Sequence, residues 1–342
     1  MQKRIPSIDV AKGIGIILVV LGHNRALKDM APLLGAGIYL FHMPMFFLLS
    51  GLLTTTPFKS AELKSKILGL LRPYLTGVVI FLPLQWLQAD HPSNHPLIGN
   101  ALWGSGNSIY NTPLWFLTCL MAGYSVLWAS GRLGLTKRAA IALPFALSCL
   151  ILTYFSIDQQ IGYQSLPKDS LDRPLGAPLN LDLALLCTAF LLLGSKFLPL
   201  IKIPPPSSAL ALVIAASGTF FVFLLLQHDP RLDLNYRLIQ HWPAALGCCI
   251  TGIIFTICLS ILISRHSATI TRPLEYFGQN TLIILVLHAP IQNHLVRFIS
   301  KYVDISLSAA ILFSLSICLI LSWISASIVS PNIHLRKFFY AK

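Results

Sequence analysis

The chain has 342 residues, of which 55% are hydrophobic and only 11% are charged, and its mean hydropathy is +0.72. Soluble domains carry about 25% charged residues, so this composition excludes a water-soluble globular protein. The formal net charge is +13, but in so apolar a chain the basic residues first indicate membrane topology, and we predict no nucleic-acid partner.

Ten apolar segments follow one another along the chain, each about 17 to 25 residues long, which is the length that a helix needs to cross a bilayer. In chain order they are 9–27, 34–54, 67–88, 113–130, 139–156, 180–198, 207–227, 243–264, 279–297 and 306–330. Continuous apolar runs favour helices over the alternating pattern of barrel strands. The sequence therefore predicts an all-α polytopic membrane protein with about ten transmembrane helices, and residues 1–342 form a single membrane-embedded domain.

The basic residues are distributed unevenly between the two sides of the membrane. An even number of crossings places both termini on one side, and that side holds 17 of the 25 Lys and Arg residues. The loop 89–112, on the opposite side, contains neither. Because cytoplasmic loops carry the excess of basic residues, we expect both termini in the cytoplasm. The expected location is the inner (plasma) membrane of a bacterium.

The first segment carries polar residues inside an apolar run, DVAKGIGIILVVLGH at 9–23. The eleven residues from Lys12 to His23 make three turns plus about 20°, so both side chains lie on one helix face, roughly 16 Å apart. Asp9 and Lys12 can pair at i,i+3, or Lys12 can extend to the membrane surface. We expect His23 near the membrane midplane or slightly beyond. Polar residues at that depth face a protein interior or a water-filled cavity.

Two further histidines lie within apolar segments. His42 belongs to FHMPMFFLLSG at 41–51, and His288 belongs, with Asn280, to GQNTLIILVLHAP at 278–290. A buried imidazole tends to remain neutral and can accept a proton, as a general base must. No carboxylate or cysteine is spaced near these histidines as a further metal ligand, so we predict no metal site.

Several segments together carry a family resemblance. They are Asp9 with KGIGIILVVLGH, in which ten residues separate Lys12 from His23, FHMPMFFLLSG at 41–51, RPY at 72–74, PLWFL at 113–117 and FGQNTLIILVLHAPI at 277–291. This set resembles the acyltransferase-3 family of integral membrane O-acyltransferases, and within it the fucose 4-O-acetylase-like branch. The resemblance covers nearly the whole chain. It implies transfer of an acetyl group from cytoplasmic acetyl-CoA to a hydroxyl of a cell-envelope glycan or lipid-linked sugar, and it leaves the oligomeric state open.

The resemblance and the residues together suggest a mechanism. We expect neutral His23 to accept the proton of the acceptor hydroxyl as that hydroxyl attacks the thioester. We expect His42, Asn280 and His288 to orient the base or stabilise the oxyanion. Lys12 and Asp9 complete the predicted catalytic set. Candidates for binding the donor's phosphates are Lys12, Lys64, Lys66 and Arg72. Candidates for lining the acceptor side are Trp115, Ser50 and Asn111.

Alternatives remain open at this point. An acetyl-histidine relay competes with direct transfer, and it would carry the acyl group from a donor inside to an acceptor outside. A different class of function is a secondary transporter or exporter whose histidines relay protons. A non-catalytic membrane scaffold is the third class. Only the enzyme releases free CoA in a manner that depends on an acceptor glycan.

Overall fold

The computed structural model describes residues 4–52, 54, 58–88, 97–105, 109–134, 141, 143–145, 147–148, 176–299, 301–302 and 304–339. Its elements, in chain order, are α1 (Pro6–His23), α2 (Arg25–Met30), α3 (Pro32–Gly51), α4 (Ser60–Gln88), α5 (Leu97–Trp103), η2 (Thr112–Leu114), α6 (Trp115–Arg132), η4 (Pro178–Asn180), α8 (Leu181–Lys202), α9 (Ser207–His228), β1 (Arg231–Asp233), β2 (Leu238–Gln240), α10 (Trp242–His266), α11 (Ala268–Gln279), α12 (Thr281–Ile299), α13 (Leu307–Ile324), η5 (Ser325–Val329) and α14 (Ile333–Phe339).

The predicted fold class is confirmed: the protein is an all-α polytopic membrane protein. Within the described residues, nine helices are long and apolar enough to cross a membrane, and they match nine of the ten predicted segments. The remaining one, 139–156, lies largely outside the described residues. The one departure from all-helical structure in the described part is a short antiparallel hairpin of β1 and β2.

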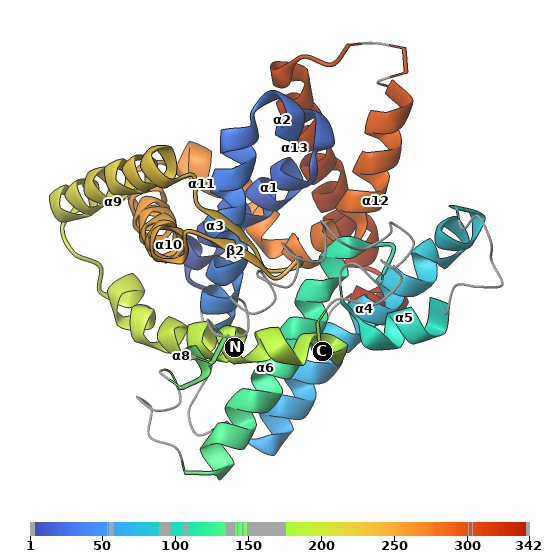
Figure 1. Cartoon of the computed structure of the whole chain (residues 1–342), viewed down its shortest axis with the longest axis horizontal. Coiled ribbons are helices and arrows are strands. Elements are labelled where there is room, and N and C mark those ends of the chain that lie inside the picture. The colour runs from blue at the N-terminus through green and yellow to red at the C-terminus, as the bar shows by residue number, and fades with distance from the viewer. Residues whose placement is uncertain are drawn as a thin grey trace.

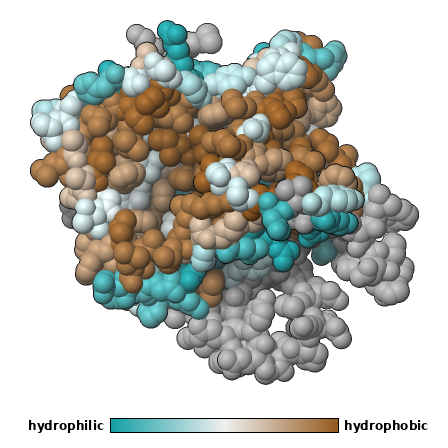
Figure 2. Space-filling view, turned by 90° about the horizontal axis from the view of Figure 1, so that it is seen from above, coloured by the Kyte–Doolittle hydropathy of each residue, from teal (hydrophilic) through white to brown (hydrophobic). Residues whose placement is uncertain are grey.

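The surface is that of a protein surrounded by lipid. Figure 2 shows a broad band of apolar side chains on one face, with hydrophilic residues gathered along its upper and lower rims. Large apolar side chains are exposed on three of the long helices, for example Val79 on α4, Phe223 on α9 and Leu312 on α13. Such a surface would promote aggregation in water, whereas in a bilayer it contacts the acyl chains.

Helix α1 lies at the centre of the bundle, where it packs against α3, α10, α11, α12 and α13 (Figure 1). Its approach to α11 depends on two glycines. A Cβ atom at Gly13 would collide with the carbonyl oxygen of Leu274, and one at Gly278 would collide with that of Asp9. Because backbone rather than flexible side chains occupies the space, this contact fixes α1 and the polar residues that it carries.

The break after α1 is made by one asparagine. The predicted segment 9–27 is too long, because α1 ends at His23 and a separate short helix, α2, follows. The Asn24 side chain caps the first turn of α2 and donates hydrogen bonds to the Ala310 carbonyl (3.0 Å) and the Ser314 hydroxyl (2.9 Å) of α13. These partners are distant in sequence, so the periodicity of the segment contains no sign of the break.

The hairpin between α9 and α10 is held by a buried ion pair. The fully buried Arg237 donates from Nε and Nη2 to the two carboxylate oxygens of Asp182, at 2.9 and 3.0 Å, and from Nη2 to the Asn180 side-chain oxygen at 2.8 Å. Asp182 lies in the first turn of α8 and Asn180 just before it. The hairpin is therefore anchored to the start of α8, although the sequence predicts only a loop there.

Candidate functional site

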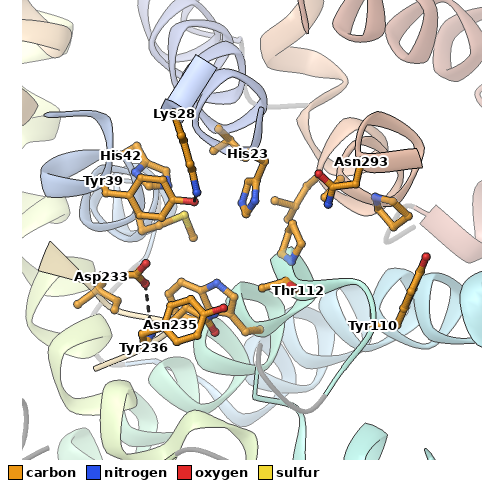
Figure 3. Close-up of a pocket in the computed structure, with 18 residues that line it drawn as sticks. His23, Lys28, Tyr39, His42, Tyr110, Thr112, Asp233, Asn235, Tyr236 and Asn293 are labelled. Atoms are coloured by element: carbon orange, nitrogen blue, oxygen red, sulfur yellow. Dashed lines mark hydrogen bonds between the residues drawn. The ribbon is translucent and has the colours of Figure 1, made fainter. Parts of the chain in front are cut away.

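A cavity of about 160 Å³, here called the His23 cavity, lies at the end of α1. Its walls come from α1, α2, α3, η2, α6, α12 and the hairpin. Figure 3 shows His23 pointing into this space, with Tyr39 and His42 on one side, Asn293 on the other and the hairpin residues below. Trp115, a predicted substrate-binding residue, also lines it.

The three intramembrane histidines lie close together, although they come from three different helices. The ring centroids of His23 and His288 are 5.2 Å apart, in an edge-to-face arrangement. Tyr39 lies between His23 and His42. Its ring centroid is 6.3 Å from that of His23 and 5.1 Å from that of His42. The structure thus brings together the histidines that the sequence singles out.

Hydrogen bonds to backbone carbonyls assign the tautomer of two of these rings. The Nδ1 atoms of His42 and His288 lie 2.7 and 2.8 Å from the carbonyl oxygens of Ile38 and Ile284, respectively. A carbonyl oxygen can only accept, so Nδ1 carries the hydrogen and Nε2 of the neutral ring is an acceptor. In the described part of the protein, Nε2 of His288 is buried without a hydrogen-bond partner. An unsatisfied acceptor therefore lies beside His23.

A lysine and an aspartate of opposite charge line the same cavity. The Lys28 ammonium group donates to the Tyr39 hydroxyl at 2.8 Å, and that hydroxyl donates to the Gly22 carbonyl at 3.3 Å. Burial lowers the pKa of Lys28 and raises the pKa of Asp233, and the attraction between the two groups partly offsets both shifts. Neither residue is distinguished by the sequence, because each lies in a short polar stretch between apolar segments.

A second cavity of about 180 Å³, here called the Lys12 cavity, lies nearer the start of α1. Lys12 and Ile16 line this cavity, whereas Val19 and His23 line the His23 cavity. These four positions follow helical spacing, so Lys12 and His23 share one face of α1, as the sequence predicts.

Two apolar side chains line both cavities. They are Met43 of α3 and Leu285 of α12, which are 8% and 6% exposed. The two cavities are therefore neighbours, and these two side chains separate them. Ser50, the second of the predicted substrate-binding residues, lines the Lys12 cavity instead of the His23 cavity.

The predicted donor-binding cations are not all in one place. The Lys66 ammonium group lies 5.3 Å from the centre of the Tyr124 ring and is close enough to Lys12 for the two charges to repel each other. Lys64 is exposed, and Arg72 lines neither of the two cavities. Lys12 and Lys66 are thus the two basic residues that the structure places together.

Asn111 lies behind the wall of the His23 cavity and is not among the residues that line it. Its side chain donates a hydrogen bond of 2.5 Å to the Val286 carbonyl. That carbonyl lies four residues before Pro290, which has no N–H to donate, so the helix itself leaves it unpaired. Asn111 therefore supports the part of α12 that carries His288.

Two other predicted residues lie outside the His23 cavity. The side chain of Asn280 donates to the Tyr276 carbonyl at 2.7 Å, at the end of α11. Asp9 and Lys12 form no ion pair within 4 Å, although both belong to the described residues. The Asp9 carboxylate still attracts Lys12 electrostatically, and the Asp9 backbone lies against Gly278 of α11.

The hairpin supplies three residues that the sequence analysis did not select. Asp233, Asn235 and Tyr236 lie at its tip and line the His23 cavity (Figure 3). The available signal is a polar and aromatic cluster, DLNY at 233–236, between two long apolar segments. Without the contacts to α8, nothing in that cluster indicates that it turns towards the histidines.

Comparison with known proteins identifies the family. The family model described as an acyltransferase domain matches residues 5–327, a range that includes α1 to α13 and all three histidines of the site. No curated protein and no solved structure gives a match. Because the family match covers nearly the whole chain, this protein belongs to the acyltransferase-3 family and is a membrane-embedded acyltransferase.

Proposed function

We propose that this protein transfers an acetyl group from cytoplasmic acetyl-CoA to a hydroxyl of a cell-envelope glycan or lipid-linked sugar. The observation that carries the proposal is the pair of adjacent cavities along one face of α1, with Lys12 in one and His23 in the other. This arrangement gives the donor and the acceptor separate approaches to a shared boundary, which a transfer between two sides of a membrane requires.

The Lys12 cavity suits the donor. Apart from Lys12, Ser50 and Thr281, its lining is apolar, as the pantetheine arm of CoA requires. Lys12, which lines this cavity, and Lys66, whose charge lies near that of Lys12, supply positive charge for the phosphates of CoA. With its phosphates near these lysines and its pantetheine arm inside the cavity, CoA places the thioester at the boundary formed by Met43 and Leu285.

The reaction then proceeds at His23. The acceptor hydroxyl oxygen attacks the thioester carbonyl carbon while the His23 imidazole takes the hydroxyl proton. The carbon–sulfur bond breaks, and the imidazolium returns its proton to the departing thiolate, which leaves as free CoA. The Nε2 acceptor of His288 stabilises the imidazolium form of His23.

The tautomers decide which groups stabilise the oxyanion. With hydrogen on Nδ1, the neutral rings of His42 and His288 offer only an acceptor on the other nitrogen, so they orient and stabilise the base. The ammonium group of Lys28 has three donors and gives one to Tyr39, so two remain for charge that develops on the thioester oxygen.

A direct test uses the purified protein in lipid vesicles with radiolabelled acetyl-CoA. We expect release of free CoA that rises when an envelope glycan fraction is added, together with label in that fraction. Movement of glycan without CoA release would instead support a transporter and would contradict the proposal.

Widening the boundary between the cavities should change the choice of acyl group. We expect Leu285→Ala to raise turnover with butyryl-CoA relative to acetyl-CoA by about tenfold, since one or two methylenes in an apolar pocket are worth that much. Leu282→Ala is the matched control, because Leu282 lies on the same helix but lines only the Lys12 cavity. If the ratio of butyryl-CoA to acetyl-CoA turnover changed equally in the two variants, the boundary would have no role in selecting the acyl group.

The orientation in the membrane is tested by labelling. We expect a cysteine at the exposed position Lys301 to react with an impermeant maleimide from outside, and one at the exposed position Lys196 to be protected. A reporter fused after Lys342 should be active in the cytoplasm. Labelling of position 196 from outside intact cells would reverse the proposed orientation.

A further inference from the structure

The tip of the β1–β2 hairpin faces His23 across the His23 cavity. Asp233, Asn235 and Tyr236 line this cavity together with His23 and His42 (Figure 3). The transfer mechanism described above uses none of the three. They therefore form a set of polar groups next to the base with no assigned task.

Two of these residues present hydrogen-bond acceptors. The Asn235 side chain is 5% exposed, and its Oδ1 atom has no hydrogen-bond partner in the described part of the chain. One carboxylate oxygen of Asp233 accepts from the backbone N–H of Tyr236 at 3.2 Å, which holds the carboxylate in place. A carboxylate has about four acceptor positions, so Asp233 keeps the capacity to accept from a ligand.

Hydrogen bonds from Arg237 hold the hairpin in place. Arg237 donates from Nη1 to the Asn235 carbonyl at 2.8 Å and binds Asp182 through two nitrogens. Asn180, a further partner of Arg237, donates in turn to the Trp115 carbonyl at 3.2 Å. One hydrogen-bond network thus joins the hairpin to Trp115, which lines the same cavity.

The charges around the cavity favour a neutral ligand. Lys28 and Asp233 both line it, so one positive and one negative group face the same space. The Asp233 carboxylate would repel a ligand with phosphates. In this respect the site differs from the Lys12 cavity, whose surroundings are cationic. A neutral ring with several hydroxyls can instead donate to Asp233 and Asn235 while it packs against Trp115.

An open groove adjoins the cavity. This groove has a volume of about 270 Å³ and shares Lys28, Tyr39 and Asp233 with the His23 cavity. A ligand with one ring beside His23 can therefore extend past Asp233 into the groove. A chain of sugars is long enough to occupy both the cavity and the groove, whereas a small alcohol is not.

We infer that the hairpin tip is the acceptor-binding element and that Asp233 and Asn235 hold a neutral sugar ring by the hydroxyls that flank the one to be acylated. The inference rests on the proposed function, since it assigns the acceptor side of the same reaction. It adds two specificity-determining residues and the charge class of the acceptor.

The experiment measures CoA release by the purified full chain in nanodiscs, with methyl glycosides as acceptor probes. The neutral probes are the methyl glycosides of glucose, galactose, fucose and N-acetylglucosamine, and methyl glucuronide is the anionic probe. We expect at least one neutral probe to stimulate CoA release and the glucuronide to be inactive.

Variants then locate the binding. We expect Asp233→Asn and Asn235→Ala each to raise the KM for the active glycoside by about 10- to 100-fold, the usual value of a hydrogen bond to a charged or buried group. This rise should exceed any change in the KM for acetyl-CoA at least tenfold. Gln240→Ala, on the same hairpin but outside the cavity lining, is the matched control and should behave as the wild type. Size-exclusion profiles and melting temperatures identify any variant that fails to fold.

The outcomes separate this inference from the proposed function. Unchanged KM values for the glycoside in both folded variants would overturn the inference. The inference would also be overturned if the protein hydrolysed acetyl-CoA in a His23-dependent manner but responded to no neutral glycoside. In that case acyl transfer itself would stand. Absence of any His23-dependent CoA release would instead refute the proposed function.

Discussion

Replacing His23 by alanine should lower turnover roughly 10²- to 10⁴-fold, which is the usual contribution of a positioned general base. The variant should still insert and fold, because the contacts that fix α1 come from Gly13 and from Asn24 rather than from the imidazole. The measurement is acceptor-dependent CoA release by purified protein, normalised to correctly folded enzyme. Near-normal transfer in a properly inserted variant would show that another group is the base, with His42 or His288 as the next candidate.

Lys12 provides the contrasting variant. Because it lines the other cavity, Lys12→Ala should mainly raise the KM for acetyl-CoA, and Lys12→Arg should retain much of the activity since the positive charge survives. Equal losses of kcat in the His23 and Lys12 variants would argue against the division of work between the two cavities.

Steady-state kinetics distinguish direct transfer from an acetyl-histidine relay. Direct transfer requires a ternary complex of donor, acceptor and enzyme, and it gives intersecting lines in a double-reciprocal plot. A relay gives parallel lines and an acetylated enzyme that accumulates when the acceptor is withheld. Mass spectrometry of the protein after incubation with acetyl-CoA alone detects that intermediate.

Removing one partner of the buried pair between the hairpin and α8 should cause the largest loss of stability. We expect Arg237→Ala to cost about 3–5 kcal/mol, because it leaves the Asp182 carboxylate buried without its partner. Asp182→Ala should cost a similar amount. The double variant should cost less than the sum of the two, since no single charge remains unpaired. Thermal unfolding in detergent measures all three.

The hairpin contains its own control. Arg231 and Asp229 also form an ion pair, at 2.9 Å, but their side chains are 37% and 61% exposed. Removal of this exposed pair should therefore cost less than about 1 kcal/mol. If Arg237→Ala melts at the same temperature as Arg231→Ala, the buried pair does not hold the hairpin.

Local periodicity was sufficient to predict much of this protein. The long apolar runs predicted the helices, and helical spacing predicted that Lys12 and His23 share a face. The motifs that resemble the acyltransferase-3 family predicted that His42 and His288 belong with His23, and the structure places the three rings together.

The missing elements depend on contacts between residues that are distant in sequence. Strands of three residues are too short to show alternation, so the hairpin has no recognisable pattern. Its anchor joins Arg237 to a residue 55 positions away, and the carbonyl that Asn111 binds lies 175 positions from it. A single sequence carries no information about such distant partners, so the hydrogen bond by which Asn111 supports α12 could not be predicted.

The separation of the two cavities has an electrical consequence. Across a membrane at 100 mV, each unit charge that is moved through the potential involves about 2.3 kcal/mol of work. Met43 and Leu285, the apolar side chains that line both cavities, oppose the passage of protons and ions between Lys12 and His23. In the proposed reaction the acetyl group, which is uncharged, passes this boundary without work against the field, while the phosphates of CoA stay on the side where they bind. The proposed reaction would therefore modify an external molecule with an internal metabolite at no cost to the membrane potential.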